Sequence, residues 1–217
     1  MKYEAERRQI IAVAQALNPL GLNSGSSGNV SCRVQDGLLL TPSGVNYESL
    51  KADDIIHMDW NGDWQVGNQT RKPSSEWRMH RDVLQAYPEM NALVHTHANY
   101  CTALAVLGKG IPAFHYMVAI AGGNDIRCAS YQTFGTQALS DTVVAALVDR
   151  KACLLANHGV VAGGKNLDEA LALLVEVETL AHQYCTALQI GQPHILSDAE
   201  MEKVLEKFKQ GYGYGES

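Results

Sequence analysis

The chain has 217 residues, of which 46% are hydrophobic and 18% are charged, and its formal net charge is −6 at pH 7. These values are ordinary for a globular protein with enough volume for a hydrophobic core. The acidic balance argues against nucleic acid as a partner, because nucleic acid usually meets a basic patch. No apolar run reaches the roughly 20 residues of a membrane span, so we expect no membrane association, although a local site can still hold an anionic small molecule.

Hydrophobic periodicity predicts helices and short strands along the whole chain. Apolar residues recur at helical spacing in some segments and form short runs in others, and Gly, Pro and Asn residues mark the boundaries. Asp36-Gly37 and Asn61-Gly62 are hairpin signals between the early strands, so we expect a largely antiparallel sheet. In chain order, the predicted elements are a helix over 4–17, strands over 30–34, 37–41, 55–58 and 64–66, a helix from 77 to before 88, a strand over 91–97, a helix over 98–107, a strand over 126–130, a helix over 137–149, a strand over 152–156, a helix over 167–189 and a last helix that ends near 209.

No internal repeat or low-complexity linker divides the sequence. We therefore expect one domain over residues 1–217, with a mobile C-terminal tail from about residue 210. The five cysteines are scattered and form no C-x-x-C pair, which indicates reduced thiols in the core. The charged N-terminal residues lack the apolar run and cleavage site of a signal peptide. We expect a cytoplasmic protein.

Three segments rich in small polar residues are candidates for an anion site. They are the loop over 22–31, which contains Ser26 and Asn29, the turn over 41–44, and the pair Ser74-Ser75 before the predicted helix. Such loops expose hydroxyls and backbone N–H groups, and a helix N-terminus favours an anion. One serine of the pair is expected to cap the helix. Taken alone, the loop over 22–31 is better explained as an ordinary turn, because Gly, Ser and Asn are common in turns.

Two histidines close a buried apolar run over residues 92–98. Side chains alternate faces along a strand, so His95 and His97 point the same way. They form half of a metal site or, alternatively, a solvent-facing pair on an edge strand. His158 ends a second predicted buried strand in the same manner. Three nitrogen ligands with an open position are typical of a catalytic zinc site rather than a structural one.

Glu76 has two interpretations. An acidic residue in the first turn of a helix is stabilised by the helix dipole. Beside a metal held by the three histidines, Glu76 would be a fourth ligand or a base. Metal, carboxylate and phosphate-binding segments together indicate chemistry at a carbonyl next to a phosphorylated arm. The other histidines are interpreted as packing or surface residues: His57, His80, His115, His182 and His194.

Eight segments together resemble the class II aldolase/adducin family, and the resemblance runs almost end to end. As a set they are highly specific, although no single one is. Within the family, the chain resembles most closely the branch whose substrate is L-fuculose 1-phosphate. The segments are Gly25-Ser26-Ser27-Gly28-Asn29-Val30-Ser31, Thr41-Pro42-Ser43-Gly44, Pro73-Ser74-Ser75-Glu76-Trp77, His95-Thr96-His97, Ile111-Pro112-Ala113-Phe114-His115-Tyr116-Met117, Thr133-Phe134-Gly135-Thr136, Asn157-His158-Gly159 and Val204-Leu205-Glu206-Lys207-Phe208-Lys209.

The resemblance implies an α/β fold, a three-layer α/β/α sandwich with a mainly antiparallel central sheet. It also implies a homotetramer with its sites at subunit interfaces. Ser26 stands where such aldolases often carry threonine, and the tail departs from the family after Lys209, so Tyr212 and Tyr214 are alternatives for one role. The implied roles are zinc binding by His95, His97, His158 and Glu76, acid/base catalysis by Glu76, phosphate binding by Ser26, Asn29, Ser43, Gly44, Ser74 and Ser75, action at the aldehyde end by Tyr116 from a neighbouring subunit, an aldehyde pocket near Phe134, and closure over the site by Tyr212.

The implied activity is a lyase of carbohydrate metabolism that cleaves a ketose 1-phosphate, L-fuculose 1-phosphate, to dihydroxyacetone phosphate and L-lactaldehyde. A zinc ion would act as the Lewis acid, with cobalt and manganese as open alternatives. The same scaffold serves ribulose-phosphate 4-epimerases, sugar-acid phosphate decarboxylases and methylthioribulose-phosphate dehydratases. The epimerases carry aspartate where Glu76 stands, whereas the decarboxylases share the histidines and a glutamate. A non-catalytic adducin-like scaffold is disfavoured, because all three metal ligands are present.

Overall fold

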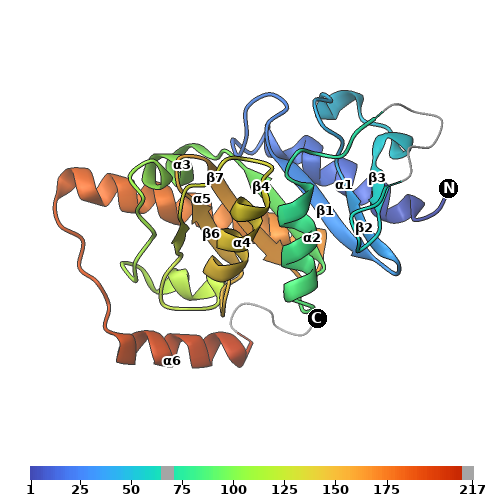
Figure 1. Ribbon diagram of the computed structural model, residues 1–217. Coiled ribbons are helices and arrows are strands. Elements are labelled where there is room, and N and C mark those ends of the chain that lie inside the picture. The colour runs from blue at the N-terminus through green and yellow to red at the C-terminus, as the bar shows by residue number, and fades with distance from the viewer. Residues whose placement is uncertain (65–70, 212–217) are drawn as a thin grey trace.

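A sheet of seven strands forms the centre of the computed structural model, which describes residues 1–64 and 71–211. The strand order is β3-β2-β1-β4-β7-β6-β5, and Figure 1 labels all of these strands except β5. Every neighbouring pair is antiparallel except β5 and β6, so the predicted mainly antiparallel sheet is confirmed. The strands are β1 Asn29–Val34, β2 Gly37–Leu40, β3 Ile56–Met58, β4 Ala92–Thr96, β5 Cys128–Ala129, β6 Ala152–Leu155 and β7 Gly159–Gly164.

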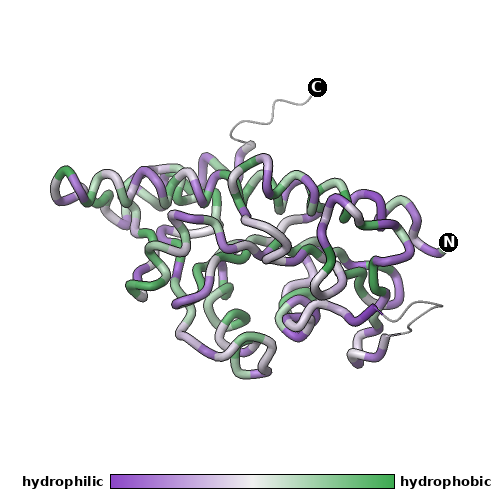
Figure 2. Tube along the Cα trace, turned by 90° about the horizontal axis from the view of Figure 1, so that it is seen from above, coloured by the Kyte–Doolittle hydropathy of each residue, from purple (hydrophilic) through white to green (hydrophobic). Residues whose placement is uncertain are grey.

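Helices cover both faces of the sheet and give the fold three layers. Apolar residues of the sheet form one core cluster with α1, α3, α5 and α6. A second cluster joins the opposite face to α2 and α4, and Figure 2 shows helical segments on both sides of the central strands. The helices are α1 Glu4–Leu17, α2 Trp77–Ala86, α3 Asn99–Ala105, α4 Gln137–Ala146, α5 Leu167–Ile190 and α6 Asp198–Lys209, with 3-10 turns η1 Tyr47–Ser49, η2 Ala52–Asp54 and η3 Tyr116–Ala121.

Alternation along β4 decides on which face the first histidine lies. Ala92 and Val94 belong to the cluster that packs with α5, whereas Leu93 belongs to the cluster that packs with α2 and α4. His95 continues this alternation on the α2 side. The site therefore forms on the face of the sheet that α2 and α4 cover.

Polar side chains cap the starts of α4, α5 and α6, whereas the starts of α1, α2 and α3 have no side-chain cap. The Asn166 side chain accepts a hydrogen bond from the Glu169 backbone N–H at the start of α5, and Ser197 caps α6 in the same way. The expected serine cap of α2 is wrong, because Glu76 occupies the N-cap position and makes no capping bond. The Ser74 hydroxyl accepts from the Glu76 backbone N–H at 3.3 Å. Because it makes no capping bond, the Glu76 carboxylate can contact other side chains.

Strand β7 is the main element that periodicity did not predict. Gly159, Gly163 and Gly164 interrupt its apolar run, and glycine weakens a strand pattern. A Cβ at Gly159 would lie 2.3 Å from the Thr96 backbone oxygen, and one at Gly164 would lie 2.5 Å from the Ala170 backbone nitrogen in α5. The close approach of β7 to β4 and its surroundings therefore requires these glycines.

Two further expectations differ from the structure in extent. The strand over 126–130 shortens to β5, preceded by a single bridge between Ile111 and Ile126. Of the strand over 64–66, Trp64 forms one bridge with Met58, and the other two residues lie outside the described range. Most of the predicted mobile tail also lies outside it. Within the described part of the chain, no helix combines the length and apolarity needed to cross a bilayer.

Candidate active site

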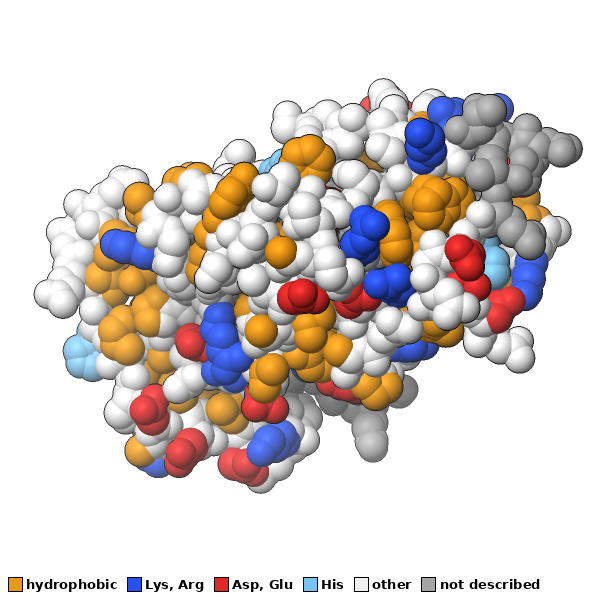
Figure 3. Space-filling model, viewed as in Figure 1, with side chains coloured by type: hydrophobic (Ala, Val, Ile, Leu, Met, Phe, Trp, Pro, Cys, Tyr) orange, Lys and Arg blue, Asp and Glu red, His pale blue; other side chains and the backbone are white. Residues whose placement is uncertain are grey.

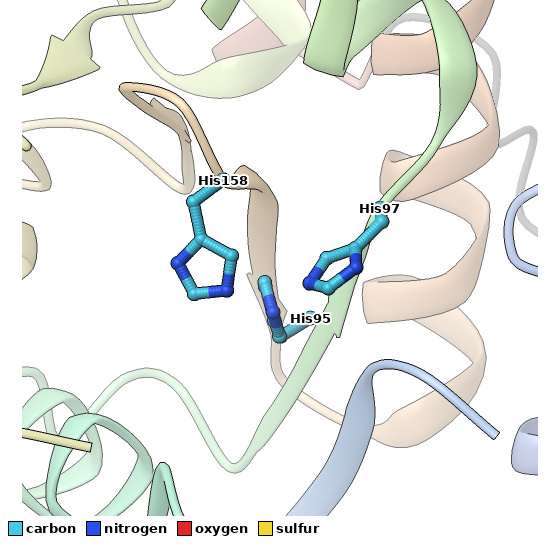
Figure 4. Close-up of side chains that lie close together, drawn as sticks. All are labelled: His95, His97 and His158. Carbon is cyan, nitrogen blue, oxygen red and sulfur yellow. The ribbon is translucent and has the colours of Figure 1, made fainter. Parts of the chain in front are cut away.

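Three imidazoles from two neighbouring strands converge on the α2 side of the sheet. His95 is the last but one residue of β4, His97 follows two residues later, and His158 lies in the turn before β7, which pairs with β4. Their ring centroids lie 4.8 to 5.2 Å apart, and one nitrogen from each lies within 4.8 Å of the others. Figure 4 shows the three rings pointing toward one another. The structure thus brings the predicted ligands together.

Local backbone geometry explains how the loops reach the histidines. Asn157 has a φ of +55°, in the left-handed region that asparagine tolerates better than most residues, and this turn delivers His158. Gly28 has a φ of +78°, and a Cβ there would lie 2.5 Å from the His95 backbone oxygen. Glycine therefore lets the polar loop before β1 lie against β4.

The Glu76 carboxylate meets the imidazoles from the start of α2. Its Oε2 lies 3.2 Å from His95 Nε2, and its Oε1 lies 3.2 Å from His158 Nε2. Asn29 Nδ2 donates a hydrogen bond to Oε2 at 2.9 Å. Glu76 is only 6% exposed. The carboxylate is therefore a buried neighbour of two of the predicted metal ligands.

The electrostatics favour an ionised carboxylate and neutral imidazoles at His97 and His158. Burial alone would raise the pKa of Glu76, but the neighbouring His95 outweighs burial and holds this pKa below its usual range. Burial, reinforced by the charge of His95, lowers the pKa of His158 to about 4 and also lowers that of His97. Burial opposes the charged form of His95, but Glu76 outweighs it and raises the pKa of His95. Neutral imidazoles are the form that binds metals.

The donor set fits a divalent metal ion. His95 Nδ1 lies 2.9 Å from the Val160 backbone oxygen, so Nδ1 carries the proton and Nε2 faces the site. Metal-bound histidines usually donate their other ring N–H in this way, to a backbone carbonyl, a carboxylate or water. An ion-pair neighbour lies 3.2 Å from each of the buried atoms His95 Nε2 and Glu76 Oε1, but neither atom makes a hydrogen bond of good geometry among the described residues, which is uncommon in proteins. The three histidines could therefore hold a metal ion, and imidazole with carboxylate suits zinc, cobalt and manganese alike.

A pocket of about 330 Å³ joins the histidines to the small polar segments. Its wall contains no Lys or Arg among the described residues, so hydroxyls, side-chain amides and backbone N–H groups are the donors that this described wall offers to an anion. The predicted site residues in the wall are Ser26, Asn29, Ser43, Gly44, Ser74, Ser75, Glu76, His97, Phe134 and His158.

Two described residues that were predicted for the site are not part of this wall. His95 is fully buried behind it. Tyr116 begins η3, is 40% exposed and has its ring stacked on His115 at a centroid distance of 4.8 Å. His115 accepts a hydrogen bond from the Met117 backbone N–H, which agrees with its interpretation as a packing residue. Tyr212 lies outside the described residues.

Four further pocket residues were not singled out from the sequence, although two of them, Ser27 and Asn157, lie within segments that carry the family resemblance. Ser27, Tyr131, Gln132 and Asn157 also line the pocket. Tyr131 and Gln132 belong to the loop between β5 and α4, where no periodicity marks them. Their position directly before Thr133-Phe134-Gly135-Thr136 was the available clue.

Two residues that do not line the pocket make hydrogen bonds to residues that do. The Tyr47 hydroxyl donates to the Gly28 backbone oxygen at 2.7 Å. His80 is fully buried, and its ring contacts Ser31 and Asn29. The interpretation of His80 as a satisfied structural histidine describes its burial, but not its connection to the site.

Comparisons with known proteins identify the family of the chain. The family model for the Class II Aldolase and Adducin N-terminal domain matches residues 8–185. The chain belongs to the class II aldolase and adducin family. It is 55% identical over 205 residues, 94% of this chain and 91% of the relative, to a 5-methylthioribulose-1-phosphate/5-deoxyribulose-1-phosphate aldolase of Rhodospirillum rubrum. It is 52% identical over 203 residues, 93% of each chain, to an L-fuculose phosphate aldolase of Escherichia coli.

A solved structure extends the agreement to three dimensions. That protein, named L-fuculose 1-phosphate aldolase, matches with a TM-score of 0.92 at 40% identity, over 96% of this chain and 98% of its own. The resemblance drawn from the sequence and the expected fold class are therefore confirmed. All three named proteins are aldolases, which supports a lyase. Their names differ in the ketose phosphate, so the family alone does not specify the substrate.

Proposed function

We propose that the protein is a metal-dependent aldehyde-lyase that cleaves L-fuculose 1-phosphate to dihydroxyacetone phosphate and L-lactaldehyde. The observation that carries this proposal is the meeting of three histidines with the buried Glu76 carboxylate in one pocket, whose other walls are hydroxyl-rich loops. A metal, a base and a phosphate cradle are the parts that the cleavage of a phosphorylated ketose needs.

The phosphate would bind to the small polar segments. Ser26, Asn29, Ser43, Gly44, Ser74 and Ser75 supply hydroxyl, amide and backbone N–H groups on one side of the pocket. Because the wall contributes no cation among the described residues, these dipoles and the metal would together balance the phosphate charge. The three histidines would hold one zinc ion per subunit, with Glu76 as a displaceable neighbour.

The chemistry divides between the metal and two side chains. The metal, when bound, supplies a Lewis acid for the charge that develops on the substrate oxygens. As the C3–C4 bond breaks, its electron pair stays on C3 and the C4 hydroxyl loses its proton to become the aldehyde. Glu76 then delivers a proton to C3, which completes dihydroxyacetone phosphate. Tyr116 would handle the proton at the aldehyde oxygen.

Tyr116 would act in the site of a neighbouring subunit, which requires an oligomer. Large apolar side chains are exposed in this chain, including Leu107 at 64% and Ile190 at 84%, and Figure 3 shows hydrophobic side chains exposed among charged ones on one face. Single exposed apolar side chains are ordinary on a monomer, and only a large contiguous patch indicates an interface, so the proposed oligomer rests on the family resemblance. We propose a cytoplasmic homotetramer with its sites at subunit interfaces, over which the tail with Tyr212 or Tyr214 closes.

A second candidate substrate is a 5-deoxy- or 5-methylthio-pentulose 1-phosphate. The relative that is 55% identical carries these substrates in its name. In addition, Tyr131 and Phe134 are 58% and 65% exposed and line the pocket, so aromatic surface is available to an apolar aldehyde substituent. A single methyl or hydroxyl contact discriminates by only about 1–3 kcal/mol, which makes direct competition between substrates necessary.

The test is cleavage of each ketose phosphate by the zinc-loaded protein, with dihydroxyacetone phosphate measured by coupled reduction. We expect product that requires both the metal and Glu76, so a chelator and Glu76→Gln abolish it. Glu48→Gln removes the same charge from an exposed position and is the matched control. Turnover of the pentulose phosphates alone would replace the fuculose assignment. Release of carbon dioxide from a 3-oxo-sugar-acid phosphate, with no aldol cleavage, would replace the lyase by a decarboxylase.

A further inference from the structure

A chain of buried hydrogen bonds leads away from the Glu76 carboxylate. Asn29 Nδ2 donates to Glu76 Oε2 at 2.9 Å. Asn29 Oδ1 is in turn hydrogen-bonded to His80 Nε2, and His80 Nδ1 lies 2.6 Å from Ser31 Oγ. Asn29 is 4% exposed, and His80 and Ser31 are fully buried. Solvent therefore does not compete for these bonds.

Two short spacings in the sequence bring these four hydrogen-bonded side chains together. Asn29 and Ser31 are two residues apart on β1, so their side chains share one face of the sheet. His80 lies one helical turn after Glu76, which places both on the same side of the start of α2. The imidazole thus contacts both β1 side chains, while Glu76 contacts the nearer one.

The positions of the protons follow from what each group can donate. An ionised carboxylate only accepts hydrogen bonds, so the Asn29 amide turns its nitrogen toward Glu76 and its oxygen toward His80. His80 Nε2 must then carry a proton. Burial lowers the pKa of His80 to about 3, so the ring is neutral at pH 7, and its bare Nδ1 accepts from the Ser31 hydroxyl. Each member of the chain has one defined orientation.

We propose that His80 is a positioning residue for Glu76, acting through Asn29. By donating to Asn29 Oδ1, it holds the amide so that an N–H group faces the carboxylate. Without that donor, the amide can turn over and place its oxygen against the carboxylate, which repels Glu76 from its place beside His95. The inference rests on the proposed function, in which Glu76 moves a proton at the dihydroxyacetone phosphate carbon.

A spectroscopic measurement tests the arrangement without any activity. Nitrogen-15 spectra of histidine-labelled protein distinguish a ring protonated at Nε2 from one protonated at Nδ1. We expect His80, assigned by its loss in His80→Phe or His80→Gln, to be a neutral Nε2–H tautomer at pH 7. An Nδ1–H tautomer or a charged ring would overturn the proposal, because neither agrees with a donor to Asn29 and an acceptor from Ser31.

A kinetic measurement tests the consequence. Deuterium uptake from D₂O into dihydroxyacetone phosphate follows the Glu76 step alone and needs no aldehyde. His80→Phe keeps an aromatic ring without a donor, and we expect it to lower the exchange rate at saturation about 10- to 100-fold, the usual effect of losing such a supporting partner. Metal content and the half-saturating concentration should change less than about threefold.

Rescue and controls separate positioning from simple loss of structure. His80→Gln retains an N–H donor, so it should recover most of the rate that His80→Phe loses. His182→Phe replaces an exposed histidine that stacks on Tyr100 at 3.9 Å, and it should exchange at the wild-type rate. Equal rates in His80→Phe and wild type, or no recovery in a folded His80→Gln, would overturn the proposal. A metal-loaded wild type that does not exchange would instead overturn the proposed function, and the tautomer would still decide the role of His80.

Discussion

Replacing Tyr47 by phenylalanine should weaken phosphate binding without touching the pocket wall. Tyr47 is 3% exposed and does not line the pocket. Its hydroxyl lies 2.7 Å from the Gly28 backbone oxygen and 3.2 Å from that of Ser27. No peptide bond is cis among the described residues, so C=O and N–H point in opposite directions. The carbonyls turned toward Tyr47 therefore turn the N–H groups of Gly28 and Asn29 the other way.

The Tyr47 hydroxyl has one proton, so Tyr47→Phe removes one donated hydrogen bond, and this sets the expected loss of stability. One hydrogen bond contributes about 1 kcal/mol net, and a buried carbonyl left without a partner costs about 1–3 kcal/mol. We expect Tyr47→Phe to lower the free energy of unfolding by about 1–3 kcal/mol. Because this hydrogen bond orders the loop before β1, part of the lost free energy should appear as weaker phosphate binding. A loss of about 0.7–1.4 kcal/mol corresponds to phosphate affinity about 3- to 10-fold weaker.

The assay pairs urea unfolding with calorimetric binding of dihydroxyacetone phosphate. Tyr87→Phe is the matched control, since its hydroxyl donates to the Val144 backbone oxygen at 2.6 Å, on α4. Both variants should lose stability, and only Tyr47→Phe should lose affinity. Equal affinities in the two variants would refute the view that Tyr47 orders the phosphate loop.

Four further predictions follow from the same structure. His158→Ala should abolish stoichiometric zinc binding, measured by metal analysis after dialysis, while circular dichroism stays unchanged. Gly28→Ala should lower the free energy of unfolding by more than about 2 kcal/mol, because left-handed strain adds to a backbone clash. Gly25→Ala, with a φ of +68° and open space around its Cβ, should cost only the strain, about 1 kcal/mol. Below pH 6.5, the metal-free protein should lose stability toward pH 3, because the pKa values of His158 and His80 are lowered to about 4 and about 3 and the unfolded chain binds protons first. Each group contributes up to about 1.4 kcal/mol per pH unit to the free energy of unfolding. If urea titrations gave the same free energy of unfolding from pH 6.5 down to pH 3, that result would contradict these pKa shifts. Phe134→Ala should raise KM for the ketose phosphate more than the inhibition constant of dihydroxyacetone phosphate, which lacks the aldehyde part. Equal changes in the two constants would contradict a place for Phe134 beside the aldehyde part of the substrate.

The group of three histidines was predictable because its signals are local. His95 and His97 end an apolar run, and their alternation on one strand fixes a common face. His158 ends a second such run. The hydroxyl-rich segments were also visible as turns, and the structure brings all three to one pocket wall.

The supports of the site were not predictable, because they join distant parts of the chain. Ser31 and His80 are 49 positions apart, and Tyr47 meets Gly28 across 19 positions. No local pattern specifies which side chains meet after the sheet forms. Strand β7 was missed for the opposite reason. Its glycines weaken the local strand signal, but they are what the close packing around β4 requires.

The proposed chemistry is tested most directly by placing the metal-loaded protein in D₂O with dihydroxyacetone phosphate and no aldehyde. We predict uptake of one deuterium at C3, lost on chelation, restored by zinc and absent in Glu76→Gln, with Glu48→Gln unaffected. This result needs no choice between fuculose and pentulose substrates. Exchange that persists in Glu76→Gln or without metal, or no exchange in the folded, metal-loaded protein, would contradict the roles proposed for Glu76 and the three histidines.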